Sequence, residues 1–293
     1  MHNKVRTVGI IGKFADAEIS GTIYKLSAFL LTKNLRVLLH EHAASVMPGH
    51  GLETADHKKI GEICDLCIIV GGDGTMLNAA RALFSYGIPL VGINRGRLGF
   101  LADISPDTVI ERVNDILQGG YIVEERFLLH AAIERGGEYI SESNAFNDVV
   151  VAKWNMARMI EFETYINDQF VNSQRSDGLI LSTPTGSTAY ALSGGGPIMH
   201  PTINAIVLVP ICPHTLSNRP IVVSGDSHID IVVTDCNYDH AQVTCDGQIN
   251  FSLFTGDRIH VRKLEKPIRL IHPADHDHFE ILREKLRWGT KLD

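Results

Sequence analysis

Apolar and polar positions follow two different periods in the first part of the chain. Short continuous apolar runs, typical of buried parallel strands, are separated by segments whose apolar residues recur every three or four positions. We expect strands at Val5–Ile11, Arg36–Leu39, Cys67–Val70 and Pro89–Ile93, with a helix carrying Ile19, Ile23, Leu26 and Leu30 after the first strand. Strands that alternate with helices indicate βαβ units, so residues 1–125 are predicted to form a Rossmann-like α/β domain.

A further helix is predicted near the end of this part. Ser105-Pro106-Asp107 has a capping hydroxyl, a proline at the first helical position and an acid in the first turn. Gly119-Gly120 marks the end of this helix. No G-x-G-x-x-G is present, and Gly9–Lys13 lacks the spacing and the trailing hydroxyl of a P-loop. The domain is therefore Rossmann-like without either of these glycine motifs.

The pattern changes near Tyr121. From there to about His272 short β-rich runs follow one another, separated by turn residues such as Arg135-Gly136-Gly137 and Asn167-Asp168. The expected strands are Phe127–Ile133, Met159–Ile166, Leu179–Ser182, Ala205–Ile211, Ile221–Val223, Ile229–Thr234, Ala241–Cys245, Arg258–Val261 and Ile268–Ile271. They predict a β-sandwich-like second domain over residues 126–273. Residues 274–293 include a helical segment, His278–Trp288, that we expect to return to the first domain.

Composition narrows the class of protein. Apolar residues make up 44% and charged residues 21% of the 293 positions, as in a globular enzyme. The formal net charge of −7 argues against broad nucleic-acid binding, so we expect no nucleic-acid partner. The chain starts without the apolar core of a signal peptide, and no apolar run has the length of a membrane span. We therefore expect a cytoplasmic protein without a membrane partner.

The cysteines are scattered and odd in number, which is typical of reduced cytosolic thiols. They are Cys64, Cys67, Cys212, Cys236 and Cys245. The first two form a C-x-x-C, but this pair enters a strand, whereas redox pairs of that kind sit at a helix start. We expect both to be packing residues.

The segment Cys67–Leu77, CIIVGGDGTML, carries the clearest chemical signal. An apolar strand runs into Gly71-Gly72-Asp73-Gly74 and a helix follows. Glycines let backbone N–H groups approach a phosphate, and a helix N-terminus adds unpaired N–H groups and partial positive charge. A carboxylate among phosphates suits deprotonation of a hydroxyl or binding of magnesium. The alternative is a tight turn in which Asp73 is only the N-cap of the helix.

A second segment, Arg175–Pro197, is dense in hydroxyls and glycines. Hydroxyls and free amides at a helix start suit ribose hydroxyls and phosphates, although such a run can also be an ordinary connector. No G-x-S-x-G is present, which excludes the usual serine-hydrolase motif. Asn147-Asp148 is open to two interpretations, a bland turn or a buried pair that binds a diol.

The run His272–His278, HPADHDH, raises the question of a metal site. No cysteine or glutamate completes a ligand set within this run, and it lies near a proline in a loop. We favour a solvated connector and predict no protein ligand for a metal.

Together these segments resemble the bacterial NAD kinases. The resemblance rests on GGDGT after a strand, on GINRGRLGFL at Gly92–Leu101, on Asn147-Asp148, on SDGLILSTPTGSTAYALSGGGP and on LIHP at Leu270–Pro273. The GGDG turn is shared with diacylglycerol, sphingosine and phosphofructo-kinases, whereas the long motif is more specific. The family most often has Asn-Glu where this chain has Asn147-Asp148, which shortens the reach of that carboxylate. The family fold, an α/β domain followed by a β-rich domain, agrees with the pattern above.

The resemblance also implies roles for single residues. Asp73 would take the proton from the adenosine 2′-hydroxyl of NAD. The phosphate-binding turn would be formed by Gly71, Gly72, Gly74 and Thr75. The NAD-binding residues would be Asp73, Gly74, Asn147, Asp148, Arg158, Arg175, Asp177, Thr188, Ala189, Tyr190, Ala191, Leu192, Ser193 and Gln248.

The implied reaction is transfer of the γ-phosphoryl group of ATP to NAD, giving NADP and ADP. Magnesium (Mg²⁺) would be the divalent cofactor, and the chain would form a homo-oligomer, with a tetramer favoured. Two alternatives remain: a lipid or sugar kinase that shares the GGDG turn, and an NAD(H)-binding sensor without catalysis.

Overall fold

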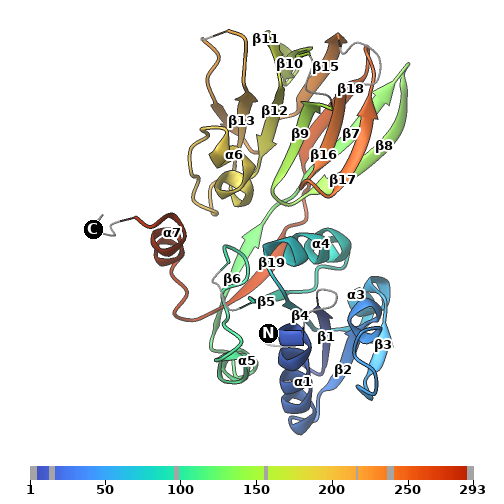
Figure 1. The fold of residues 1–293 in the computed structure, drawn as a ribbon, viewed down its shortest axis with the longest axis vertical. Helices are drawn as coiled ribbons and strands as arrows, with labels where there is room; N and C mark the ends of the chain where they lie inside the picture. Colours follow the sequence, from blue (N-terminus) through green and yellow to red (C-terminus); the bar gives the residue numbers. More distant parts are fainter. Residues whose placement is uncertain are drawn as a thin grey trace. The chain divides into compact units, whose positions relative to one another are not determined.

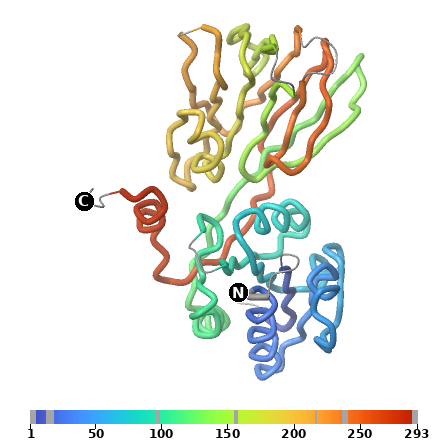
Figure 2. Tube along the Cα trace, viewed as in Figure 1, coloured from blue at the N-terminus to red at the C-terminus, as the bar shows by residue number. Residues whose placement is uncertain are grey.

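The computed structural model describes residues 5–12, 17–95, 99–154, 158–215, 217–235 and 241–288. Cys236 and the middle of the Gly92–Leu101 motif lie outside these ranges. The chain divides into two compact units (Figures 1 and 2). Unit 1 comprises Met1–Glu125 and Ile268–Asp293, and unit 2 comprises Arg126–Pro267.

Unit 1 is built on a seven-stranded sheet with the order β3-β2-β1-β4-β5-β19-β6. Its strands are β1 (Thr7–Gly12), β2 (Arg36–His40), β3 (Glu53–Ala55), β4 (Leu66–Val70), β5 (Leu90–Ile93), β6 (Tyr121–Arg126) and β19 (Ile268–Pro273). Pairing from β3 to β19 is parallel throughout, as the alternation of strands and helices predicts. All five residues of β4 are buried, so its continuous apolar run is explained by helices on both faces.

Helices of unit 1 lie on both faces of this sheet. They are α1 (Ala17–Thr32), α2 (Glu41–Ala44), α3 (His57–Ile63), α4 (Asp73–Leu83) and α5 (Val109–Leu117), with a 3₁₀ turn η1 (Phe84–Tyr86). A last helix, α7 (His278–Leu286), follows β19. On one face α1 and α5 contact each other and share a core with the sheet; α3 and α4 contact each other on the opposite face (Figure 1). Asp56 caps α3 by accepting a hydrogen bond of 2.8 Å from Lys59 N.

Two predictions for this unit need correction. The helix expected to begin at Ser105-Pro106-Asp107 begins at Val109, because residues 106–108 form a turn in which Ser105 Oγ accepts from Asp107 N. The strand predicted at Ile268–Ile271 does not extend the β-rich domain: as β19 it pairs in parallel with β5 (Figure 1). The return to unit 1 therefore starts at β19, before residue 274.

Unit 2 is a β-sandwich of two six-stranded sheets. Their orders are β11-β10-β15-β18-β7-β8 and β14-β13-β12-β9-β16-β17. The first sheet holds β7 (Leu129–Arg135), β8 (Glu138–Ala145), β10 (Ile160–Ile166), β11 (Gln169–Ser176), β15 (Ile229–Asp235) and β18 (Arg258–Lys263). The second holds β9 (Asp148–Lys153), β12 (Gly178–Ser182), β13 (Ala205–Ile211), β14 (Ile221–Ser224), β16 (Ala241–Cys245) and β17 (Ile249–Leu253). Neighbouring strands in both sheets pair antiparallel, and one buried apolar cluster joins the two sheets, which confirms the predicted fold class.

The predicted turns lie between paired strands. Arg135-Gly136-Gly137 connects β7 to β8, with φ of 60° and 88° at the two glycines. Asn167 and Asp168 connect β10 to β11 with φ of 50° and 64°, a left-handed conformation that Asn and Asp adopt more readily than most residues. A 3₁₀ turn η2 (Thr185–Thr188) and a short helix α6 (Tyr190–Ser193) follow β12.

Two further predictions, on the cysteines and on membrane spans, can be compared with the described residues. Among the described residues, Cys64, Cys67, Cys212 and Cys245 form no disulfide. Burial raises the pKa of Cys64 to about 12, which makes a reactive thiolate unfavourable there and fits a packing role. None of the helices in the described ranges has the length and hydropathy of a membrane span.

Candidate functional site

The glycine turn of unit 1 joins β4 to α4. Gly72 is the N-cap residue of α4, and Asp73 is the first residue of the helix. Gly71 N donates to Ile93 O at 2.8 Å, and a Cβ at Gly71 would lie 2.5 Å from Thr75 Oγ1. No atom of the described residues lies within 4 Å of a Cβ built on Gly72. The turn thus has one glycine required by packing and one whose side-chain position faces open space.

The carboxylate of Asp73 holds a neighbouring loop and does not cap its own helix. Oδ2 accepts from Phe100 N and Oδ1 from Leu101 N, each at 3.1 Å. Gly99 allows this approach, because a Cβ there would lie 2.5 Å from Asp73 Oδ1. The N-cap interpretation of Asp73 is therefore wrong. A carboxylate has about four lone-pair positions, so these two bonds leave capacity to accept a proton or a substrate hydroxyl.

A cavity of about 410 Å³ lies in unit 1 at the carboxyl ends of β4 and β5. Its lining includes Val70 and Asn94 at the strand ends, Lys25 from α1, and Arg95. Ligands of open α/β sheets bind at this edge, and two cationic side chains there suit phosphates. The sequence analysis did not select Lys25 or Arg95. The position of Arg95 two residues after a predicted strand end was the available signal.

In unit 2, Asn147-Asp148 lies at the start of β9, fixed by a distant carboxylate. Asp246, in the turn between β16 and β17, accepts hydrogen bonds from three successive backbone amides: Phe146 N at 3.0 Å, Asn147 N at 2.7 Å and Asp148 N at 3.2 Å. Both side chains of the pair face the interior: Asp148 is 5% exposed, and Asn147 Oδ1 is buried and has no hydrogen-bond partner among the described residues. The bland-turn interpretation is wrong, because Asp148 is a buried strand residue.

Hydroxyls of the second motif, Arg175–Pro197, also hold residues 146–147 in place. Thr183 Oγ1 donates toward Phe146 O at 2.7 Å and accepts from Gly186 N at 3.1 Å. Ser182 Oγ lies 3.3 Å from Asn147 O, and a Cβ at Gly186 would lie only 2.3 Å from that oxygen. Part of the motif therefore serves to position Asn147.

Asp148 has a strongly shifted acidity. Burial, followed by the neighbouring charge of Asp246, raises the pKa of Asp148 to about 7. Such a carboxyl exchanges a proton near neutral pH, which is a property of functional sites more often than of structural ones.

The remaining candidate residues of unit 2 differ in their contacts and in their exposure to solvent. Asp177 forms an ion pair with Lys153, with Oδ1 2.6 Å from Nζ, and Arg175 lies 3.6 Å from Glu161. Arg158, Gln248, Tyr190 and Ser193 are exposed, and Thr188, Ala189 and Leu192 are partly buried. Ala191 is fully buried in an apolar cluster with Ile180 and Val207, so its side chain serves packing.

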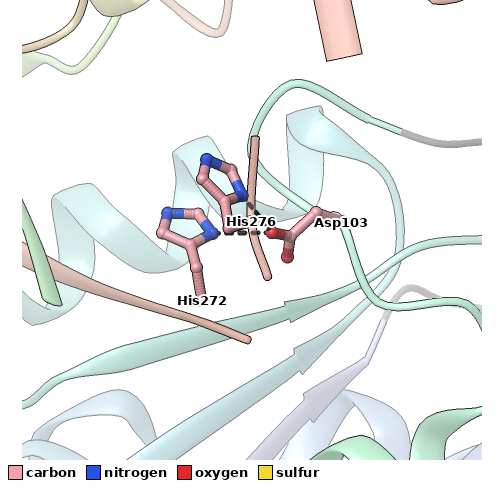
Figure 3. Close-up of side chains that lie close together, drawn as sticks. All are labelled: Asp103, His272 and His276. Carbon is pink, nitrogen blue, oxygen red and sulfur yellow. Dashed lines mark hydrogen bonds and ion pairs between the residues drawn. The ribbon is translucent and has the colours of Figure 1, made fainter. Parts of the chain in front are cut away.

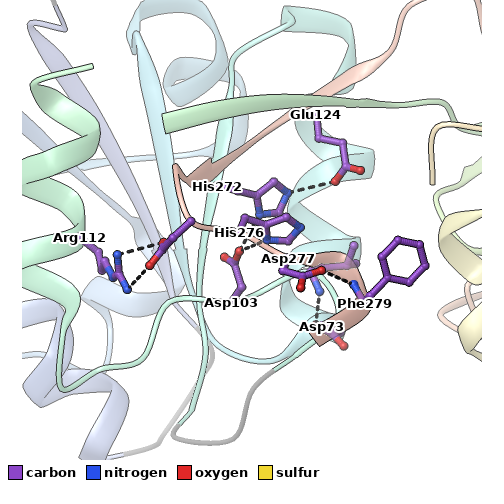
Figure 4. A network of polar contacts seen from close by, with 10 residues as sticks. Asp73, Asp103, Arg112, Glu124, His272, His276, Asp277 and Phe279 are labelled. Carbon is purple, nitrogen blue, oxygen red and sulfur yellow. Dashed lines mark hydrogen bonds and ion pairs between the residues drawn. The ribbon is translucent and has the colours of Figure 1, made fainter. Parts of the chain in front are cut away.

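The histidine run is not the solvated connector that we expected. His272 in β19 and His276 in the following turn both hydrogen bond to Asp103, and their side chains are 2% and 7% exposed (Figure 3). Burial raises the pKa of Asp103, but the two histidine hydrogen bonds outweigh it and lower the pKa to about 2. Burial lowers the pKa of His272, and the bonds to Asp103 and Glu124 reverse this and raise it (Figure 4). The lowered pKa of Asp103 and the raised pKa of His272 both mean that the cluster favours an ionised carboxylate beside a protonated imidazole. No local pattern indicated Asp103, which lies 169 residues from His272.

Comparisons with known proteins agree on one family. The model of the ATP-NAD kinase N-terminal domain matches residues 8–121, and that of the ATP-NAD kinase C-terminal domain matches residues 146–273. An NAD kinase from Pseudomonas entomophila is 54% identical over 287 residues, covering 98% of this chain and 97% of that protein. One from Ectopseudomonas mendocina is 53% identical over the same length and coverage.

Solved structures give the same result. Yeast NADH kinase complexed with NADH superposes with a TM-score of 0.90 at 25% identity, covering 100% of this chain and 90% of that one. An NAD kinase from Archaeoglobus fulgidus in complex with ATP has a TM-score of 0.75 at 26% identity, covering 96% of this chain and 98% of that one. The chain therefore belongs to the NAD kinase family.

Proposed function

We propose that Asp73 is the general base with which this chain transfers the γ-phosphoryl group of ATP to the adenosine 2′-hydroxyl of NAD. The NAD kinase activity follows from the family. One observation supports the role of Asp73: its carboxylate is fixed at the N-terminus of α4 by Phe100 N and Leu101 N, with lone pairs to spare. An alcohol is a poor nucleophile at neutral pH, and a positioned base accelerates its attack by about 10²–10⁴-fold.

The cavity of unit 1 is the part we assign to the phosphates of ATP. Lys25 and Arg95 line it, and the adjoining Gly71–Thr75 turn presents backbone amides at the start of a helix. The open space at Gly72 leaves room for a phosphate oxygen to approach the main chain. These features would hold the transferred group in line with the acceptor hydroxyl, and alignment is a major part of phosphoryl-transfer catalysis.

Kinases of this family act with a divalent cation, and we propose magnesium. When bound, it would offset the negative charge that builds on the transferred group. Magnesium keeps several waters and takes one or two carboxylates besides the phosphates. Asp107, which lines the same cavity as Lys25 and Arg95, is the carboxylate of unit 1 that would hold it.

For NAD, we assign the ribose contacts to Asn147 and Asp148. Their backbone is fixed by Asp246 and Thr183, and Asn147 Oδ1 is a buried acceptor to which no described residue donates a hydrogen bond. A diol donates two hydrogen bonds, which this amide oxygen and carboxylate can accept. The other contacts proposed are Gly74, Arg158, Arg175, Asp177, Thr188, Ala189, Tyr190, Leu192, Ser193 and Gln248, with the backbone of Ala191.

Further assignments concern the whole chain. We place nucleotide phosphate binding in unit 1 and NAD binding and oligomer contacts in unit 2. A homo-oligomer is proposed, with a tetramer favoured, acting in the cytoplasm.

The deciding experiment measures NADP formation by the purified protein given NAD, ATP and magnesium. Asp73→Asn should lower kcat at least a hundredfold while NAD still binds, because the amide cannot take the proton. Asp115→Asn, a change at an exposed carboxylate of α5, is the matched control and should retain turnover. Near-normal turnover by Asp73→Asn would refute the role as base. NAD binding without ATP consumption by the unmodified chain would indicate a sensor.

A further inference from the structure

Asp246, which is not among the candidate site residues, holds the segment to which we assign ribose binding. Its Oδ1 accepts hydrogen bonds from Asn147 N at 2.7 Å and from Asp148 N at 3.2 Å, and its Oδ2 accepts from Phe146 N at 3.0 Å. The main chain makes a further bond, because Asp246 N donates to Asp148 O at 2.9 Å. The start of β9 is thus tied to Asp246 through both its side chain and its main chain.

The turn that carries this carboxylate is itself rigidly held. Asp246 and Gly247 have φ of 53° and 61°, and Gln248 N donates to Cys245 O at 3.0 Å, as in a type I′ turn. Asp-Gly and Asn-Gly are the pairs that favour this turn. The strand before the turn, β16, pairs with both β17 and β9. The sheet therefore fixes the place of the carboxylate before any ligand binds.

A carboxylate suits this position better than an amide would. A carboxylate offers about four lone-pair positions, whereas a side-chain amide offers only those of its single oxygen. Phe146 and Asp148 are 0% and 5% exposed, so water gives their N–H groups little alternative to the oxygens of Asp246. An amide at position 246 would turn an NH₂ group toward one of these donors. The main-chain N–H groups of residues 146–148 therefore depend on the negative charge and on both oxygens of Asp246.

We propose that Asp246 is a positioning residue for NAD: it holds Asn147 and Asp148 where their side chains bind the ribose, and it governs the affinity for NAD through these two residues. This assignment rests on the ribose contacts proposed above. A shift of about 1 Å in a substrate-binding group can cost about a hundredfold in rate or affinity, so the hydrogen bonds to a segment next to the ligand matter as much as the contacts themselves.

Asp246 also acts on Asp148 through its charge. Burial, followed by this charge, raises the pKa of Asp148 to about 7. Around Asp148, β12 presents the uncharged Ser182 as its pairing partner, and the thiol residue of β16, Cys245, pairs with Val149. A ribose hydroxyl donates to the ionised carboxylate, so the affinity for NAD should rise as the pH rises through this pKa. Without the charge of Asp246 only burial remains, and the rise should move to lower pH.

The test measures steady-state kinetics of the full chain, together with the Kd for NAD by calorimetry at a series of pH values. Asp246→Asn keeps the turn, because Asn-Gly also suits type I′, but it loses the charge and one acceptor. Its KM for NAD should rise about tenfold or more, with kcat at saturating NAD and KM for ATP nearly unchanged. Asp246→Gly also fits the positive φ and removes both oxygens, so it should raise the KM for NAD further. In Asp246→Asn the rise of NAD affinity with pH should have its midpoint at lower pH than in the unmodified chain.

A matched control lies in the turn between β10 and β11. Asp168 is exposed and also has a positive φ, 64°, so Asp168→Asn should leave the KM for NAD and its pH dependence unchanged.

The outcomes separate this inference from the proposed function. If Asp246→Gly fails to fold by circular dichroism, Asp246→Asn decides alone. A fall in kcat with an unchanged KM for NAD and an unshifted pH midpoint would overturn the positioning role, because a purely structural residue changes only the amount of active protein. Normal kinetics in the folded variants would overturn it as well. An unmodified chain that forms no NADP would refute the proposed function and this inference with it.

Discussion

The buried carboxyl of Asp148 makes the stability of unit 2 depend on pH in an unusual direction. Its pKa is about 7 in the folded chain, against about 4 in an unfolded one. Between these values the folded state binds the extra proton, so stability is fully present at low pH and is lost as pH rises through the folded pKa. Most carboxylates in folded proteins act in the opposite sense.

The size of the effect follows from the two pKa values. Each unit of pKa difference is worth about 1.4 kcal/mol, so the full loss is about 4 kcal/mol, of which about 3 kcal/mol falls between roughly pH 5 and pH 8. This is a large share of the about 5–15 kcal/mol by which domains are stable.

The assay is urea unfolding followed by circular dichroism at both pH values. Asp148→Asn cannot ionise, so its free energy of unfolding should fall by about 3 kcal/mol less than that of the unmodified chain over this interval. Asp168→Asn is the matched control, because Asp168 is an exposed residue of unit 2 at a positive φ of 64° that Asn also tolerates. Equal pH dependence in the unmodified chain and in Asp148→Asn would refute the assignment of a raised pKa.

Two glycine substitutions test the two halves of the proposed site. Gly186→Ala puts a Cβ 2.3 Å from Asn147 O, so we expect a loss of about 1–3 kcal/mol in unfolding free energy and a KM for NAD at least tenfold higher, measured by steady-state kinetics. Unchanged KM would show that the position of Asn147 does not govern NAD binding. Gly72→Ala meets no atom within 4 Å, so its thermal unfolding should match that of the unmodified chain while the KM for ATP rises, because the methyl group occupies space assigned to a phosphate. Normal kinetics for this variant would remove Gly72 from the phosphate site.

Local patterns predicted many of the elements whose burial is regular, although β9, whose first four residues are buried, was not among the expected strands. The strand Cys67–Val70 and the helix after it were found because a fully buried run and a glycine turn are both visible in a few consecutive residues. The edge strands β8 and β11 were missed, since only one or two of their residues are buried and neither has a clear apolar alternation. Pairing of β19 with β5 depends on contacts about 180 residues apart, which no local period encodes.

The candidate site was also predicted only in part. The chemistry of Asp73, Asn147 and Asp148 was inferred from residue type and from the family resemblance, whereas the groups that fix them were not. Phe100 and Leu101 hold Asp73 through main-chain amides, which leave no mark in a sequence. Asp246 reaches the amides of residues 146–148 from about 100 positions away, so only the folded sandwich brings it there. The resemblance named Gln248 in this turn but not the carboxylate that shapes it.

The place of β19 between β5 and β6 has a consequence for the order in which the molecule is made. Unit 2 occupies the chain between β6 and β19, two strands that are neighbours in the sheet of unit 1. During synthesis the ribosome completes all of unit 2 before the strand that fills this position leaves the exit tunnel. The first unit to begin is thus the last to close, and until then the edges of β5 and β6 remain open to mispairing.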